Sequence, residues 1–189
     1  MGWLDDLFGR TRIKRSAPDN LFRLSTAEPD IEDKLGVRFA GRVATVLRAL
    51  EAHRFENVVT EVRNVLGRQS QDLPVTVADA TDSLHFRWLL FHSADLTACL
   101  TAAHLVEELA QESGFDDALL AALADFGSFA LVFSYRHGTF YPFAQTGRQQ
   151  RDNSREIRTA AMLDKVLPIE ANPELWYPLW DPPWDAGRP

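Results

Sequence analysis

The chain has 189 residues, of which 46% are hydrophobic and 25% charged, values typical of a single globular domain. Its net charge of −7 argues against general nucleic-acid binding, because such binding depends on Lys and Arg side chains that neutralise phosphates. The lone cysteine excludes an internal disulfide and a cysteine-based zinc site.

Residues 1–20 are predicted to form an amphipathic N-terminal segment followed by a basic linker. Apolar side chains recur at helical spacing within residues 1–9, and Asp5 and Asp6 face away from them. We expect weak, reversible contact with an anionic membrane surface; the alternatives are a groove on a partner protein or packing against the chain's own domain. The contact residues of this hypothesis are Trp3, Leu4, Leu7, Phe8, Arg10, Arg12, Lys14 and Arg15.

The next segments carry apolar residues with mixed periodicity. Residues 21–35, around Pro29, are predicted to be a docking segment that is partly helical. Residues 37–48 alternate loosely and predict a strand. Residues 53–66 place their apolar side chains on one helical stripe, and Gly67 ends the predicted helix.

A hairpin and a long helix are predicted in the middle of the chain. Residues 75–78 and 84–91 read as two strands separated by a turn cluster, and they pair as a hairpin. Residues 94–112 form the clearest helix, with Ser93 or Asp95 as its N-cap.

Three details of this region bear on function. Cys99 falls among apolar neighbours and is predicted to be a small core residue. His104 and Glu108 provide only half of a metal site, so we expect them to belong to a polar stripe that faces water. Residues 116–126 favour a helix by propensity, with a buried strand as the alternative.

A second hairpin is predicted from residues 130–136 and 139–143. The dipeptide His137-Gly138 suits a two-residue type I′ turn, because glycine readily takes a positive φ. Pro142 cannot donate a ladder hydrogen bond, which indicates an edge strand. The implied register pairs Tyr135 with Phe140 and Val132 with Phe143.

The C-terminal quarter is predicted to be a short helix and an extended tail. Residues 154–165 form the helix, with Asn153 and Glu156 as a capping box. Residues 168–189 hold six of the ten prolines, which forbids a regular helix there. We therefore expect an extended strap that packs on the domain through Trp176, Trp180 and Trp184, with presentation of these side chains to a partner as the alternative.

Together these elements predict an α+β fold. It consists of a mainly antiparallel sheet of two or more hairpins, packed by two or three helices within a single domain of residues 21–167. The sequence contains no nucleotide-binding, metal-binding or nucleophile motif, so we expect no cofactor, no metal and no catalytic residue. The remaining enzymatic alternative is a pocket in which Arg136, His137 and Asp152 converge.

Several stretches resemble the PspA-associated protein B family (PspAB). They are residues 1–9 (MGWLDDLFG), 136–143 (RHGTFYPF), 151–153 (RDN), 167–170 (LPIE) and 176–181 (WYPLWD). The resemblance implies a link to the membrane-remodelling protein PspA in the phage-shock envelope-stress system, and it implies no chemistry. It also implies structural roles for the motif residues Gly138, Phe140, Tyr141, Pro142, Phe143, Arg151, Asp152, Asn153, Trp176 and Trp180.

The functional hypothesis is a non-enzymatic adaptor in membrane-stress response that binds a coiled-coil PspA-like protein. The absence of a long apolar run and of signal-peptide features predicts a cytoplasmic protein, peripheral on the cytoplasmic membrane face. The alternative is an α+β chaperone-like module that holds a protein client and acts as a homodimer. An exposed apolar sheet face would favour this alternative, and a sheet covered on both faces would count against it.

Overall fold

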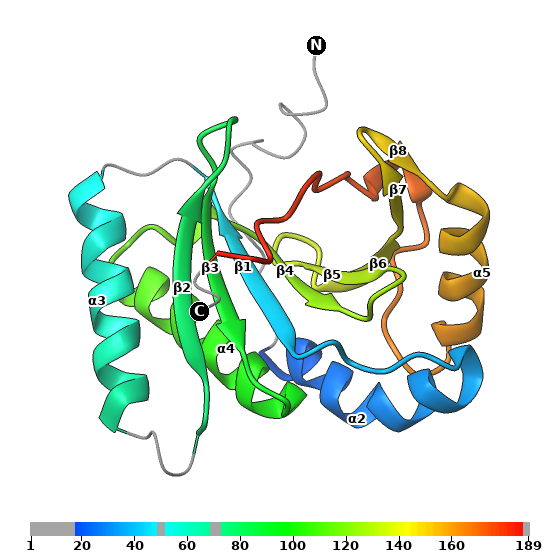
Figure 1. The fold of residues 1–189 in the computed structure, drawn as a ribbon, viewed down its shortest axis with the longest axis horizontal. Helices are drawn as coiled ribbons and strands as arrows, with labels where there is room; N and C mark the ends of the chain where they lie inside the picture. The colour runs from blue at the N-terminus through cyan, green and yellow to red at the C-terminus, as the bar shows by residue number, and fades with distance from the viewer. Residues whose placement is uncertain (1–17, 49–51, 69–72, 187–189) are drawn as a thin grey trace.

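The predicted fold class is confirmed by a computed structural model, which describes residues 18–48, 52–68 and 73–186 (Figure 1). The helices are α2 (Pro18–Leu35), α3 (Ala52–Arg68), α4 (Leu96–Glu112) and α5 (Asn153–Leu163), with short 3-10 turns at Asp116–Ala118 and Pro173–Leu175. The strands are β1 (Arg42–Leu47), β2 (Thr76–Thr81), β3 (Arg87–His92), β4 (Leu119–Asp125), β5 (Ala130–Ser134), β6 (Thr139–Phe143), β7 (Gln145–Gly147) and β8 (Gln150–Arg151).

An antiparallel sheet in the order β2-β3-β1-β4-β5-β6 forms the centre of the fold. The two predicted hairpins, β2–β3 and β5–β6, are its two ends. Strands β1 and β4 lie in the middle and are buried along nearly their whole length. Because both faces of these strands are covered, apolar residues fill consecutive positions instead of alternating.

Strand β4 corrects the helical interpretation of residues 116–126. Residues 119–124 are all Leu or Ala, which are among the best helix formers. Pairing with β1 on one side and β5 on the other overrides that propensity. The buried-strand alternative is confirmed.

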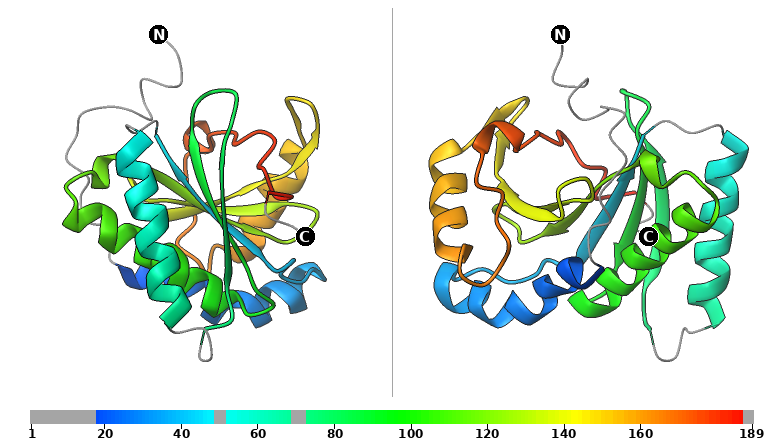
Figure 2. Two further views of the ribbon diagram at one scale, coloured as in Figure 1. Left: turned by 60° about the vertical axis from the view of Figure 1, so that its left-hand side comes forward. Right: turned by 180° about the vertical axis from the view of Figure 1, so that it is seen from behind.

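Helices α2, α3 and α4 cover one face of the sheet, and α4 crosses β1, β3 and β4 (Figure 2). Cys99 of α4 is fully buried, as predicted, and burial raises the pKa of its thiol to about 12. The opposite face carries the buried residues Trp88, Leu90 and Leu123, and the C-terminal strap packs on it through Trp176 and Leu179. The sheet is therefore covered on both faces.

The β5–β6 hairpin has a different register from the prediction. Phe133 pairs with Phe140 and Ala130 with Phe143, so the predicted pairing was wrong by two residues. A type I′ turn needs a positive φ at both central residues, whereas within this loop only Gly138 (φ 67°) has one. The connection is consequently a longer loop over residues 135–138, closed by the Gly138 amide bonding to the Ser134 carbonyl at 2.8 Å.

Strand β6 ends the sheet, as Pro142 predicted. Its outer edge bonds to the segment that follows α5: the Phe140 amide donates to the Pro168 carbonyl, and the Glu170 amide donates to the Phe140 carbonyl, both at 2.8 Å. The start of the strap is thereby fixed to the edge of the sheet.

Two predictions about helices need correction. Helix α2 begins at Pro18, inside the segment predicted as a linker, and it continues through Pro29 as one helix. The polar stripe of α4 does not face only water. His104 is half-buried against Phe22 of α2, at 5.5 Å between ring centroids, and its Nδ1 lies 3.2 Å from the buried Glu107 carboxylate.

Candidate partner-binding surface

The N-terminal contact residues lie outside the described part of the chain. This holds for Trp3, Leu4, Leu7, Phe8, Arg10, Arg12, Lys14 and Arg15. No helix in residues 18–48, 52–68 or 73–186 is long and apolar enough for a membrane crossing. The motif residues of the C-terminal quarter, in contrast, all lie within the described part of the chain.

Arg151 connects α5, the sheet and the strap. Its Nε and Nη2 atoms bond to the Glu156 Oε2 at 2.8 and 2.7 Å, and its Nη1 donates to the Trp176 carbonyl at 2.9 Å. Glu156 is 2% exposed, and its Oε1 also accepts from the Ala144 amide at 2.8 Å. Arg151 further stacks over the Phe143 ring, with its Cζ 5.3 Å from the ring centroid. These contacts hold the helix, the sheet edge and the strap in one arrangement.

Aromatic pairs fasten the strap onto β6. The Tyr141 and Trp176 rings are stacked at 6.5 Å between centroids, and Phe143 meets Trp180 edge-on at 5.2 Å. The Tyr141 hydroxyl donates to the Tyr177 carbonyl at 3.0 Å. Burial raises the pKa of Tyr141, an effect that the Arg151 charge partly opposes, so the hydroxyl stays a neutral donor.

The N-terminus of α5 is capped by Asp152 instead of Asn153. The Asp152 carboxylate accepts from the Arg155 amide at 2.9 Å, while Asn153 is exposed as the first helical residue. The predicted capping box is wrong because Glu156 turns inward to Arg151 and Ala144, and not back to the start of its own helix. The RDN motif thus fixes the helix through Arg151 and Asp152.

Beside this fixed helix lies a groove of about 320 Å³, which we call the α5 groove. One wall is α5, the other is the end of α2 with the chain that follows it, and the turn after β4 closes the base. Its lining residues are Leu35, Val37, Ser128, Phe129, Arg155, Arg158, Thr159 and Met162. Figure 1 shows α5 beside the C-terminal end of α2, at the end of the molecule opposite α3.

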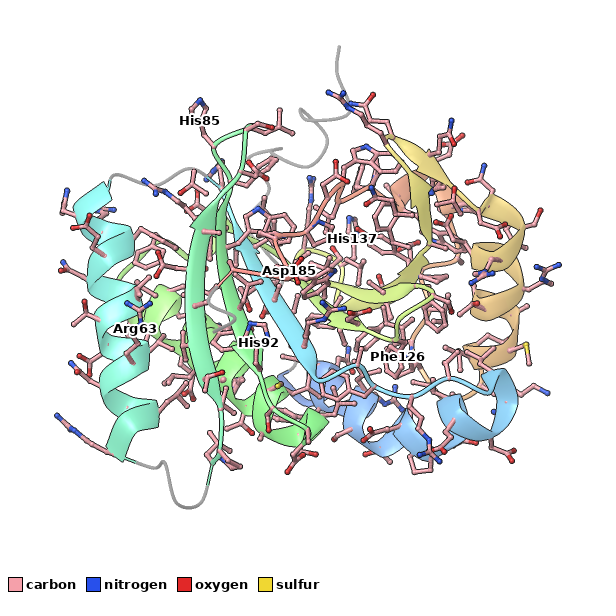
Figure 3. The ribbon with its side chains drawn as sticks, viewed as in Figure 1. Arg63, His85, His92, Phe126, His137 and Asp185 are labelled. Atoms are coloured by element: carbon pink, nitrogen blue, oxygen red, sulfur yellow. The ribbon has the colours of Figure 1, made fainter. Side chains whose placement is uncertain are left out.

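The base of the α5 groove is aromatic and well supported. Phe129 is buried and stacks on Phe126, labelled in Figure 3, with ring centroids 5.7 Å apart. Phe126 in turn meets Phe39 at 6.2 Å. Above this base Met162 is 42% exposed, which makes it one of the most exposed large apolar residues in the described part of the chain. An apolar side chain of a partner would therefore be buried between Met162 and an aromatic base that is already packed.

Arg158 provides a positive charge at the rim of the groove. The neighbouring cations are engaged: Arg155 with Asp152, Arg38 with Glu32, and Lys34 with Asp30. Arg158 is exposed and makes no ion pair or hydrogen bond within residues 18–48, 52–68 and 73–186. The groove thus combines apolar walls with a cation available to an incoming carboxylate.

Ile157 is the other exposed apolar residue of α5, at 57% exposure, but it does not line the groove. Met162 follows it by five residues, which places the two side chains about 140° apart around the helix. A ligand seated in the groove therefore touches Met162 and not Ile157.

The three residues of the enzymatic alternative are not brought together by the fold. Arg136 and His137 lie in the loop before β6, whereas Asp152 bonds to Ala144 just beyond the opposite end of that strand, so the three do not converge. No group of three potential metal ligands occurs among the described residues. On α4, burial raises the pKa of Glu107, an effect that its hydrogen bond with His104 opposes.

Sequence reasoning identified the motif residues of this region but not the groove. Its walls come from three segments of the chain, at 35–37, 128–129 and 155–162. One signal was present: Ile157 and Met162 fall off the buried stripe of α5, which contains Ala160 and Leu163. Single exposed apolar residues are common on protein surfaces, so this signal did not by itself locate the groove.

Comparison with known proteins identifies a family for this chain. The family model described as PspA associated protein B matches residues 1–184. No match was found among curated proteins or among solved structures.

Proposed function

Because the chain belongs to the PspA associated protein B family, we propose that it is a non-enzymatic adaptor that binds a PspA-like protein through the α5 groove. The observation that carries this proposal is the half-exposed Met162 above a buried aromatic base, next to Arg158, which has no ion-pair partner among the described residues. Recognition sites of adaptors commonly combine an apolar anchor position with a charged rim.

The architecture supports binding more than catalysis. The motif residues with the strongest chemistry, Arg151, Asp152 and Tyr141, are occupied by structural contacts that position α5 and the strap. These contacts fix α5, so the side of α5 that faces solvent is a rigid surface. A rigid surface loses little conformational entropy when a partner binds to it.

The chaperone-like alternative receives less support. It requires an apolar sheet face open to a client, whereas residues on both faces of this sheet are buried, among them Leu89 and Leu90, which point to opposite sides. The covered sheet therefore counts against a homodimeric chaperone.

A variant pair tests the groove as the binding surface. Met162→Glu is expected to weaken binding of the PspA-like protein from the same organism at least about tenfold, because it places a charge where an apolar contact forms. Ile157→Glu makes the same chemical change on the same helix outside the groove and should leave the affinity within about twofold. Isothermal titration calorimetry measures both. Equal losses for the two variants would contradict the groove assignment.

The adaptor is further proposed to touch the cytoplasmic face of a membrane weakly through residues 1–15. Amphipathic spacing in residues 1–9, followed by a basic run, supports this part of the proposal. The full-length protein is expected to co-sediment with vesicles rich in anionic lipid, less so with neutral vesicles, and less at high salt. Deletion of residues 1–15 should abolish co-sedimentation, and equal binding of the two proteins would remove the membrane contact from the proposal.

A further inference from the structure

We infer that the ligand of the α5 groove is one amphipathic helix whose apolar stripe is flanked by carboxylates. The inference rests on the proposed function and specifies which chemistry of the partner the groove accepts. It follows from the shape of the groove, the charge at its rim and the rigidity of its walls.

The shape selects a helix. The α5 wall of the groove runs from Arg155 to Met162, about 12 Å along the helix, and the opposite wall is formed by Leu35 and Val37 at and just beyond the end of α2. A second helix packs against such a wall by placing its side chains between those of α5, at about 8–10 Å between axes. The volume of about 320 Å³ is at the lower end for a small-molecule site and suits one or two apolar anchor side chains.

The charge selects carboxylates. Arg158 and Met162 are four residues apart on α5, so the Arg158 guanidinium and the apolar contact point lie one helical turn from each other. A partner helix matches this pair when an acidic residue lies about one turn from an apolar anchor. Arg158 can bind that carboxylate with two parallel hydrogen bonds.

The rigidity favours a preformed site. Asp152 caps α5, Arg151 ties it to the sheet and the strap, and the Arg155 guanidinium donates to the Ser128 carbonyl in the turn that closes the base. The groove therefore needs little rearrangement before it accepts a helix.

The chain offers a direct probe of this site. It contains only two methionines, Met1 and Met162, so protein labelled with ¹³C in the methionine methyl groups gives at most two methyl signals. The Met162→Leu variant identifies the signal of the groove. Two synthetic helical peptides with the same leucine stripe, one flanked by Glu and the other by Lys, serve as ligands.

The Glu-flanked peptide is expected to shift the Met162 signal saturably, with an affinity at least about tenfold higher than that of the Lys-flanked peptide. Arg158→Glu should reverse that preference, and Ile157→Glu should preserve it. Raising the salt concentration should weaken the Glu-flanked peptide most. Equal responses to the two peptides, no response to either, or a shift that depends only on protein concentration and so indicates a second copy, would each overturn the inference.

Titration with the PspA-like protein itself separates this inference from the proposed function. Binding that leaves the Met162 signal unchanged would overturn the acidic-helix inference while the adaptor function stands. A response to the Glu-flanked peptide without any binding of the PspA-like protein would overturn the adaptor function while the groove chemistry stands.

Discussion

Replacing Arg151 with methionine is expected to lower the free energy of unfolding by about 3–5 kcal/mol. The substitution leaves the Glu156 carboxylate, only 2% exposed, with the Ala144 amide as its one remaining hydrogen-bond donor in the described part of the chain. It also removes the bond from Nη1 to the Trp176 carbonyl. A buried charge that loses its partner retains its desolvation penalty, which is why this change should be among the largest in the molecule.

Chemical denaturation at pH 7 measures the effect, and Arg155→Met is the matched control. Arg155 also pairs with a carboxylate near the start of α5, but that pair is exposed, at 44% and 31% for Arg155 and Asp152, and should contribute about 1 kcal/mol or less. The double variant Arg151→Met with Glu156→Met should recover much of the loss, because no buried charge remains. If Arg151→Met and Arg155→Met had similar effects, the proposed connection between α5 and the strap would be wrong.

Local patterns predicted most elements of the fold. In α4 the apolar stripe and the Asp95 cap were sufficient, because the carboxylate accepts from the Thr97 and Ala98 amides, as a capping residue should. The Pro142 position at a sheet edge followed from its missing N–H donor.

The failures occurred where tertiary contacts decide between local options. The Leu and Ala residues of β4 favour a helix by intrinsic propensity. They form a strand because the segment lies between β1 and β5 and pairs with both. Glu156 fits a capping-box pattern, but the half-buried Arg151 guanidinium attracts it inward. The α5 groove could not be predicted, since its walls are brought together only by the completed fold.

Trp176→Ala is expected to lower the free energy of unfolding by about 3–5 kcal/mol. Trp176 is 6% exposed, its ring stacks on Tyr141, and its indole Nε1 donates to the Glu170 carbonyl at 3.0 Å. Glu170 is itself bonded to Phe140 at the sheet edge, so losing the indole weakens the point where the strap is fixed. Trp180→Ala, at a half-buried position, should cost about 1–2 kcal/mol, and Trp176→Phe should fall between the two.

The two large effects should not be additive. Arg151 binds the Trp176 backbone carbonyl, so displacement of the strap in the Trp176→Ala variant removes part of what Arg151 stabilises. The combination of Arg151→Met and Trp176→Ala should therefore cost about 1–3 kcal/mol less than the sum of the single changes. Strict additivity would mean that the strap and α5 are held independently, and the position of the α5 groove would then depend on Arg151 through Glu156 alone.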